Sequence, residues 1–76
     1  MATRHLQAWI DRIPQPRRDA LRAAEHACHA RQSCARKLYF HVTHGNVRRA
    51  RMLTRMLAFW DWRLLETARD VAREYA

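Results

Sequence analysis

The chain has one glycine, Gly45, in 76 residues, and its two prolines, Pro14 and Pro16, both lie near its start. Glycine and proline are the residues that most strongly interrupt regular structure. The long stretches 17–44 and 46–76 therefore contain nothing that breaks a helix or a strand. Apolar residues recur in them at spacings of three and four, which is the period of a helix face. The sequence predicts an all-α fold.

We expect a single helical domain over residues 1–76, with helices at about 3–13, 16–43 and 46–75. Pro14 separates the first two helices, because proline lacks an N–H and disfavours helix in the residue before it. The first helix is short, and its apolar stripe consists of Leu6, Trp9, Ile10 and Ile13.

The two long helices are joined at Thr43-His44-Gly45-Asn46. Gly45 can adopt the left-handed conformation that closes a helix, and Asn46 is a residue type that caps the next one. Since a turn this short makes its two helices antiparallel neighbours, the sequence predicts a long antiparallel helical hairpin.

The third predicted helix is apolar on more faces than one neighbouring helix can cover. Its main stripe consists of Leu53, Met56, Leu57, Trp60, Leu64, Ala68, Val71 and Tyr75. Within it, the residues that we assign to the core or to a dimer contact are Leu53, Leu57, Trp60, Leu64 and Val71. A chain this short buries only about 60% of its unfolded surface. We therefore expect a homodimer in which two hairpins form a four-helix bundle. An exposed docking surface is the alternative use of the same apolar excess.

Positive charge is concentrated around the predicted turn. The segment 31–63 contains eight basic residues and one acidic residue, Asp61, within a chain of net charge +8. A field this local attracts and orients an acidic partner. The residues that we predict to bind this partner are Arg36, Lys37, Arg48, Arg51, Arg55, Phe59, Trp62 and Arg63.

Two kinds of partner fit this pattern. The favoured hypothesis is a non-enzymatic regulatory or inhibitory protein that binds an acidic protein surface, because Trp, Phe, Met and Arg are typical of interface centres. Small basic helical proteins of this kind are often encoded by phages and mobile elements. This link rests on amino-acid composition alone. The alternative is DNA or RNA, since guanidinium groups suit phosphates and aromatic rings stack on bases. A third interpretation is that the arginines only form a solvent-exposed face and bind no partner.

The residues that carry chemistry do not combine into a site. The pattern Cys28-x5-Cys34-x6-His41-x2-His44 matches no standard zinc motif. On a continuous helix the two cysteines point in different directions, so we expect neither a metal nor a cofactor. No acid lies near the turn to support nucleophilic catalysis. The apolar runs are too short to cross a membrane, and two cysteines do not indicate a disulfide framework. We therefore expect a cytoplasmic protein that is not an enzyme.

Overall fold

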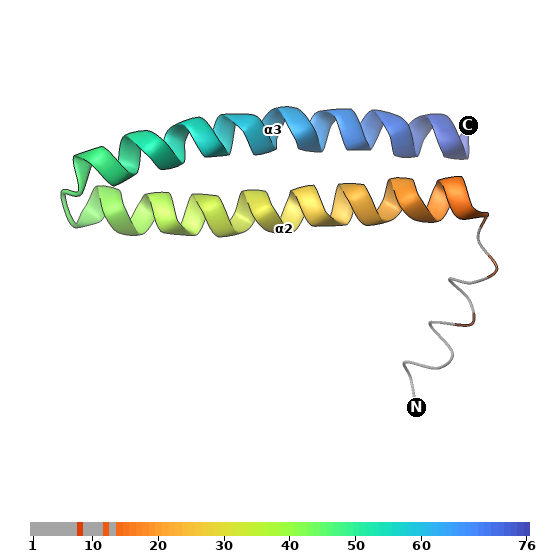
Figure 1. Cartoon of the computed structure of the whole chain (residues 1–76), viewed down its shortest axis with the longest axis horizontal. Helices are drawn as coiled ribbons and strands as arrows, with labels where there is room; N and C mark the ends of the chain where they lie inside the picture. Colours follow the sequence, from red (N-terminus) through yellow and green to blue (C-terminus); the bar gives the residue numbers. More distant parts are fainter. Residues whose placement is uncertain (1–7, 9–11, 13) are drawn as a thin grey trace.

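Two long antiparallel helices make up the described part of the chain (Figure 1). Helix α2 spans Gln15–Thr43 and helix α3 spans Val47–Tyr75, with 29 residues in each. The helices lie side by side over their whole length, so the start of α2 is next to the end of α3. The predicted all-α hairpin is therefore confirmed.

The computed structural model describes Ala8, Arg12 and residues 14–76. The short helix predicted at residues 3–13 thus lies outside the described residues, apart from Ala8 and Arg12. Helix α2 begins just after Pro14 and has Pro16 in its first turn, where the missing N–H of proline would have no partner within the helix in any case.

The turn at Gly45 has the hydrogen bonds of a Schellman motif. Gly45 is left-handed, with φ 73°. Its N–H donates to the carbonyl of Val42 at 3.2 Å, and the N–H of Asn46 donates to the carbonyl of His41 at 2.8 Å. Asn46 occupies the N-cap position of α3, but its side chain makes no capping bond. The predicted cap is wrong because the Asn46 amide instead donates from Nδ2 to Nδ1 of His41 at 2.9 Å.

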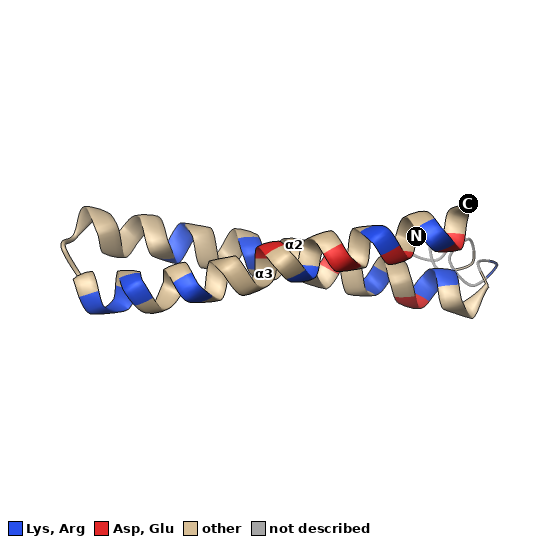
Figure 2. Cartoon of the chain, turned by 90° about the horizontal axis from the view of Figure 1, so that it is seen from above, with Lys and Arg blue, Asp and Glu red and all other residues tan. Residues whose placement is uncertain are grey.

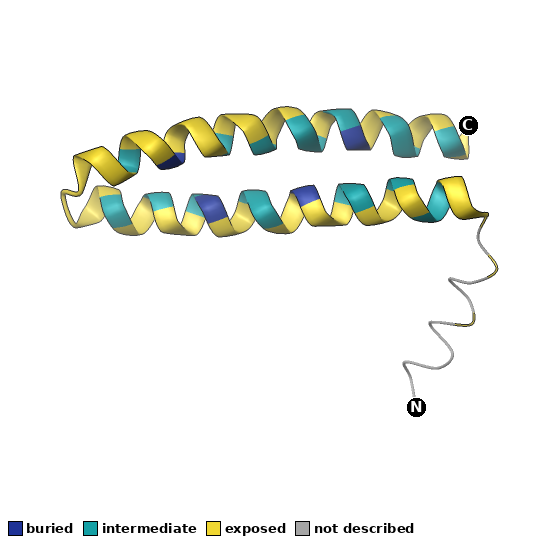
Figure 3. Cartoon of the chain, in the orientation of Figure 1, coloured by how far each residue is buried: buried dark blue, intermediate teal, exposed yellow. Residues whose placement is uncertain are grey.

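The contact between the helices follows a heptad pattern. Each helix has one row of buried and half-buried residues at alternating spacings of three and four, as in a coiled coil, and the buried sides of the two helices face each other (Figure 3). On α2 they are Ala20, Ala24, Ala27, Arg31, Cys34, Leu38 and His41. On α3 they are Ala50, Leu53, Leu57, Trp60, Leu64, Thr67, Val71 and Glu74. We call these two rows together the seam.

Three small side chains and one leucine form the most buried part of the seam. Ala27 and Thr67 have no exposed surface, and Cys34 and Leu53 are each 4% exposed. The thiol of Cys34 donates to the carbonyl of Leu53 at 3.3 Å and so links the two helices. The Thr67 hydroxyl is satisfied within its own helix, donating to the carbonyl of Leu64 at 3.0 Å. This core is small, and much apolar surface of the hairpin remains uncovered.

Candidate partner-binding surface

Basic residues occur along the whole hairpin, whereas acidic residues are confined to one half of it (Figure 2). No Asp or Glu occurs from residue 26 to residue 60, so the acidic residues lie in the half of the hairpin nearer the chain ends. The half nearer the turn carries six exposed basic residues, none of which pairs with a carboxylate among the described residues. They are Arg36, Lys37, Arg48, Arg49, Arg51 and Arg55.

At its edge towards the chain ends, this basic region is neutralised. Arg31 donates from Nε to Oδ1 of Asp61, and this hydrogen bond together with the negative charge of Asp61 raises the pKa of Arg31. Arg63 is half-buried, and its Nη1 lies 3.8 Å from Oε2 of Glu66. The unopposed charge therefore begins beyond these two pairs, and Arg63, predicted as a binding residue, lies at its margin.

Three of the free arginines surround a shallow groove on the outer side of α3. The groove is lined by Val47, Arg48, Arg51, Met52, Arg55 and Met56. Met52 is 49% exposed and Met56 is 44% exposed. Met56 was expected in the main apolar stripe, but it lies beside the seam residue Leu57 and borders this groove instead. Guanidinium groups and thioethers thus alternate on a surface that no other described segment covers.

A row of aromatic rings continues this surface away from the turn. The ring of His26 in α2 meets Trp60 edge-on, with centroids 5.5 Å apart. Trp60 in turn lies 5.0 Å from Phe59, and Phe59 lies 6.0 Å from Trp62. Because Trp60 is half-buried in the seam, its ring contact restricts the orientation of the Phe59 ring. Phe59 and Trp62 are 51% and 56% exposed. The contact of His26 with Trp60 was not predictable from the sequence, because it depends on the register of the two helices.

We name this combined surface the turn-end patch. It consists of Arg48, Arg51, Met52, Arg55, Met56, Phe59 and Trp62. All of these residues lie on α3. Five of the predicted binding residues are thereby brought together with two methionines.

The two predicted basic residues of α2 lie on different sides of that helix. Lys37 follows His26 by eleven residues, or about three turns at 3.6 residues per turn, so it lies on the side where His26 meets Trp60. Arg36 is about 100° away from Lys37. It lies on the back of α2, far round the helix from the half-buried Leu38. Only Lys37 is placed to extend the turn-end patch.

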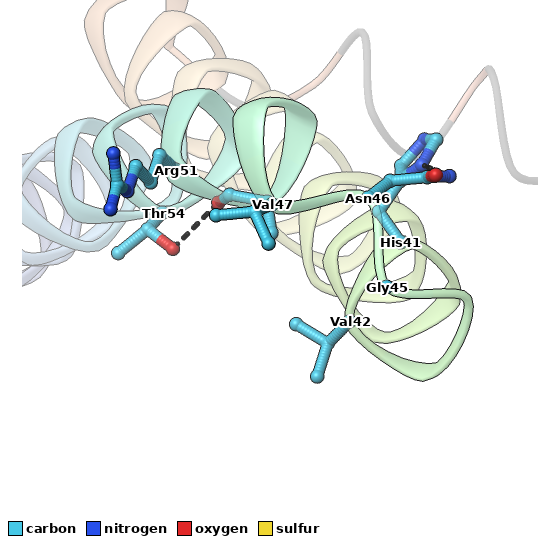
Figure 4. Close-up of a pocket in the computed structure, with 8 residues that line it drawn as sticks. His41, Val42, Gly45, Asn46, Val47, Arg51 and Thr54 are labelled. Carbon is cyan, nitrogen blue, oxygen red and sulfur yellow. Dashed lines mark hydrogen bonds between the residues drawn. The ribbon is translucent and has the colours of Figure 1, made fainter.

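A second hollow lies at the turn (Figure 4). It is lined by His41, Val42, Gly45, Asn46, Val47, Ala50, Arg51 and Thr54. The Thr54 hydroxyl donates to the Ala50 carbonyl at 2.8 Å, so this polar group is already satisfied. Val42 and Val47 are each 60% exposed. The lining of this hollow is mainly apolar and contains no acid.

The residues assigned to the core or to a dimer contact all face α2. Leu53 is buried, and the others are half-buried: Leu57, Trp60, Leu64 and Val71. Packing within one chain therefore accounts for them. Ala68 and Tyr75, which were included in the same stripe, are exposed. The fully buried Thr67 takes the seam position next to Ala68.

The described residues hold no group of three or more His, Cys, Asp and Glu side chains that could bind a metal ion. Cys28 is exposed and Cys34 is buried, as expected from their different directions on one helix. Neither α2 nor α3 is long and apolar enough to cross a membrane.

Comparison with known proteins returned no relative of this chain: no protein-family model matches it, and neither a curated protein nor a solved structure matches it significantly. The candidate site therefore stands on its own geometry.

Proposed function

We propose that this protein is a non-enzymatic regulatory or inhibitory protein that binds an acidic surface of a protein partner through the turn-end patch. The observation that carries the proposal is the exposure of Met52, Met56 and Phe59 inside a region without any carboxylate, with the exposed Trp62 at the margin of that region. Exposed apolar side chains of this size, surrounded by unpaired arginines, are a common composition of interface centres.

The chemistry of the patch fits an amphipathic acidic partner. Arg48, Arg51 and Arg55 present planar guanidinium groups that can bind carboxylates through two parallel hydrogen bonds. Met52 and Met56 lie in the same groove, and methionine adapts its shape to varied apolar surfaces. A partner that offers both carboxylates and an apolar anchor therefore uses every component of the patch.

Nucleic acid is the second candidate, supported by the same arginine row. Arg48, Arg51 and Arg55 lie along one side of α3, and the exposed rings of Phe59 and Trp62 continue in that direction. Phosphates bind guanidinium groups, and bases stack on aromatic rings. A protein partner is favoured because the methionines between the arginines add nothing to the binding of phosphates.

A charge reversal with a matched control tests the favoured proposal. Arg51→Glu changes the patch, whereas Arg69→Glu makes the same change 18 residues, or about five turns, further along the same side of α3. Both arginines are exposed. Each variant is used to capture proteins from a lysate of the source cells. The captured protein is identified by mass spectrometry, and its affinity for each variant is then measured.

We expect Arg51→Glu to weaken binding by about 30-fold or more, which corresponds to the roughly 2 kcal/mol lost when a charge pair at an interface is broken. Arg69→Glu should bind like the unaltered protein. Equal affinities for the two variants would refute the proposed surface.

The nucleic-acid alternative is tested by titration with DNA and RNA at several salt concentrations. Three phosphate contacts from Arg48, Arg51 and Arg55 would give a slope of about −2 to −3 in a plot of log affinity against log salt. Binding with this slope, lost in Arg51→Glu and kept in Arg69→Glu, would replace the protein partner with nucleic acid.

Three further expectations belong to this proposal. The hairpin pairs with a second copy, because its own core is small. Residues 3–13 form a short helix, for which the apolar stripe ending at Ile13 is the support. The protein is cytoplasmic, where thiols such as the free Cys28 and Cys34 stay reduced.

A further inference from the structure

The side of the hairpin opposite the Phe59 ring differs from the turn-end patch in its residue types and charge. Two cross-helix contacts mark the two sides: His26 meets Trp60 on one, and Arg31 pairs with Asp61 on the other. Asp61 follows Trp60 and is therefore about 100° further round α3. We name the side that carries Arg31 and Asp61 the neutral face.

The neutral face contains two rows of small and apolar residues at heptad spacing. Each row lies about a quarter of a turn from the seam, on the side of the Arg31–Asp61 pair. On α3 the row includes Thr54, Ala58, Leu65, Ala68 and Ala72, together with the charged residues Arg51 near the turn and Asp61 in the middle. On α2 it includes Leu21, Cys28, Gln32, Ala35, Tyr39 and Val42. A second heptad row on each helix is the pattern of a helix with two neighbours.

Large apolar side chains are exposed along the whole neutral face. Of the eleven large apolar residues that are exposed in the described chain, six lie here: Leu21, Tyr39, Val42, Val47, Leu65 and Tyr75. They extend from the open end of the hairpin to the hollow beside the turn shown in Figure 4. No described segment covers them.

Most of the charges on the neutral face are already engaged within the chain. Asp61 pairs with Arg31. Arg17 lies over the ring of Tyr75, 4.9 Å from its centroid, and donates from Nε to the carbonyl of Glu74 at 2.8 Å. Covering this face would therefore bury no unpaired charge over most of its length. The exceptions are Arg51 at the turn end of the α3 row and Glu25 at the border, which lies 3.6 Å from His29.

We infer that the neutral face binds a second copy of this chain, so that two hairpins form a four-helix bundle. The face is about 43 Å long and about 20 Å wide, since a helix rises 1.5 Å per residue and is about 10 Å across. Its area is thus close to the roughly 800 Å² that each partner buries in a stable protein interface. The proposed function expects a second copy without placing it. This inference assigns the face that the second copy covers, and it does not depend on partner binding by the turn-end patch.

Charge determines how the two copies are oriented. Each turn end carries six basic residues without an acid, so two turn ends placed together would repel each other strongly. Placing them at opposite ends separates them by about 43 Å, several times the Debye length of about 8 Å at physiological salt. In this arrangement α2 packs against α2 of the second copy, and α3 packs against its α3. Apart from Arg51, which borders the neutral face, the turn-end patch then remains exposed once at each end of the dimer.

Cys28 provides a direct test of this arrangement. It is exposed, it lies on the neutral face, and it is one residue from the middle of α2. The two copies of Cys28 therefore meet across the two-fold axis. Cys34→Ala leaves Cys28 as the single thiol of the chain. On mild oxidation we expect a species of twice the 9.1 kDa mass of one chain, seen on a non-reducing gel and lost on reduction.

The matched control moves the thiol to the back of the same helix. Ser33 is exposed and points about 140° away from Cys28. A chain whose only cysteine is introduced by Ser33→Cys, with both natural cysteines replaced, should stay unlinked under the same oxidation. Cross-linking of both chains to the same extent, or of neither, would overturn the inference.

Solution mass gives a second readout that does not depend on thiols. Leu65→Arg places a charge on the neutral face and should shift the protein from dimer to monomer at micromolar concentration. Met56→Arg, on the turn-end patch, should leave the dimer intact. A monomeric unaltered protein, or a dimer broken by Met56→Arg and not by Leu65→Arg, would refute the assignment. Since no partner is present in these measurements, their outcome is independent of the proposed function.

Discussion

Replacing Gly45 with alanine isolates the contribution of backbone conformation at the turn. Gly45 has φ 73°, and a Cβ built at this position has no heavy atom within 4 Å. The substitution therefore creates no clash and removes no side-chain contact. Its cost is the left-handed conformation alone, which is about 1–2 kcal/mol for a residue with a Cβ.

The size of this effect makes it easy to measure. For a domain of 60–100 residues, 1 kcal/mol shifts the unfolding midpoint by about 4–8 °C. We therefore expect Gly45→Ala to lower Tm by about 4–16 °C in thermal unfolding followed by circular dichroism. The proteins must be compared at equal concentration, because association stabilises the folded state.

Asparagine at the same position separates strain from other causes. Asn tolerates the left-handed region better than alanine does, so Gly45→Asn should lose clearly less stability than Gly45→Ala. An alanine variant as stable as the unaltered protein would show that the turn does not need a left-handed residue. Equal losses for Ala and Asn would show that conformation is not the cause.

Three further substitutions test the seam and the patch, each by urea or thermal unfolding. Ala27→Leu adds three carbons where no surface is exposed and should cost about 1–3 kcal/mol; no loss would mean that the helices pack less closely than the structure shows. Thr67→Val should change stability by less than about 1 kcal/mol, since the hydroxyl only donates to carbonyls of its own helix, and a larger loss would contradict this. Trp62→Ala should change stability by less than about 0.5 kcal/mol, because Trp62 is 56% exposed, while weakening partner binding by about tenfold or more; unchanged binding would remove Trp62 from the patch.

The helical hairpin was predictable from local features of the chain. The scarcity of glycine and proline, the heptad spacing and the single Gly45 each act within one helix or one turn. The starts and ends of the two long helices follow from these features to within one residue. The absence of a side-chain cap from Asn46 was not predictable, because it depends on the contact of the Asn46 amide with His41 across the turn.

The binding surface was predictable in composition but not in layout. Arg48, Arg51 and Arg55 share one side of α3 by their spacing alone. Which of Arg36 and Lys37 can extend the patch, however, depends on which side of α2 faces α3. The support of Phe59 by Trp60 and His26 likewise depends on the register between the helices.

By itself the sequence determined two long helices, the antiparallel turn and a basic half without acids, because each of these depends on residues close together in the chain. Only the tertiary structure decided which apolar rows are used up in the seam. Leu53 and Leu57 pack against α2, whereas Met52 and Met56 stay exposed on one side of the hairpin. The exposed Leu65 lies on the opposite side of the hairpin, on the neutral face. The physical reason is that a helix can direct several apolar rows towards a neighbour, and the relative rotation of the two helices selects which one is buried.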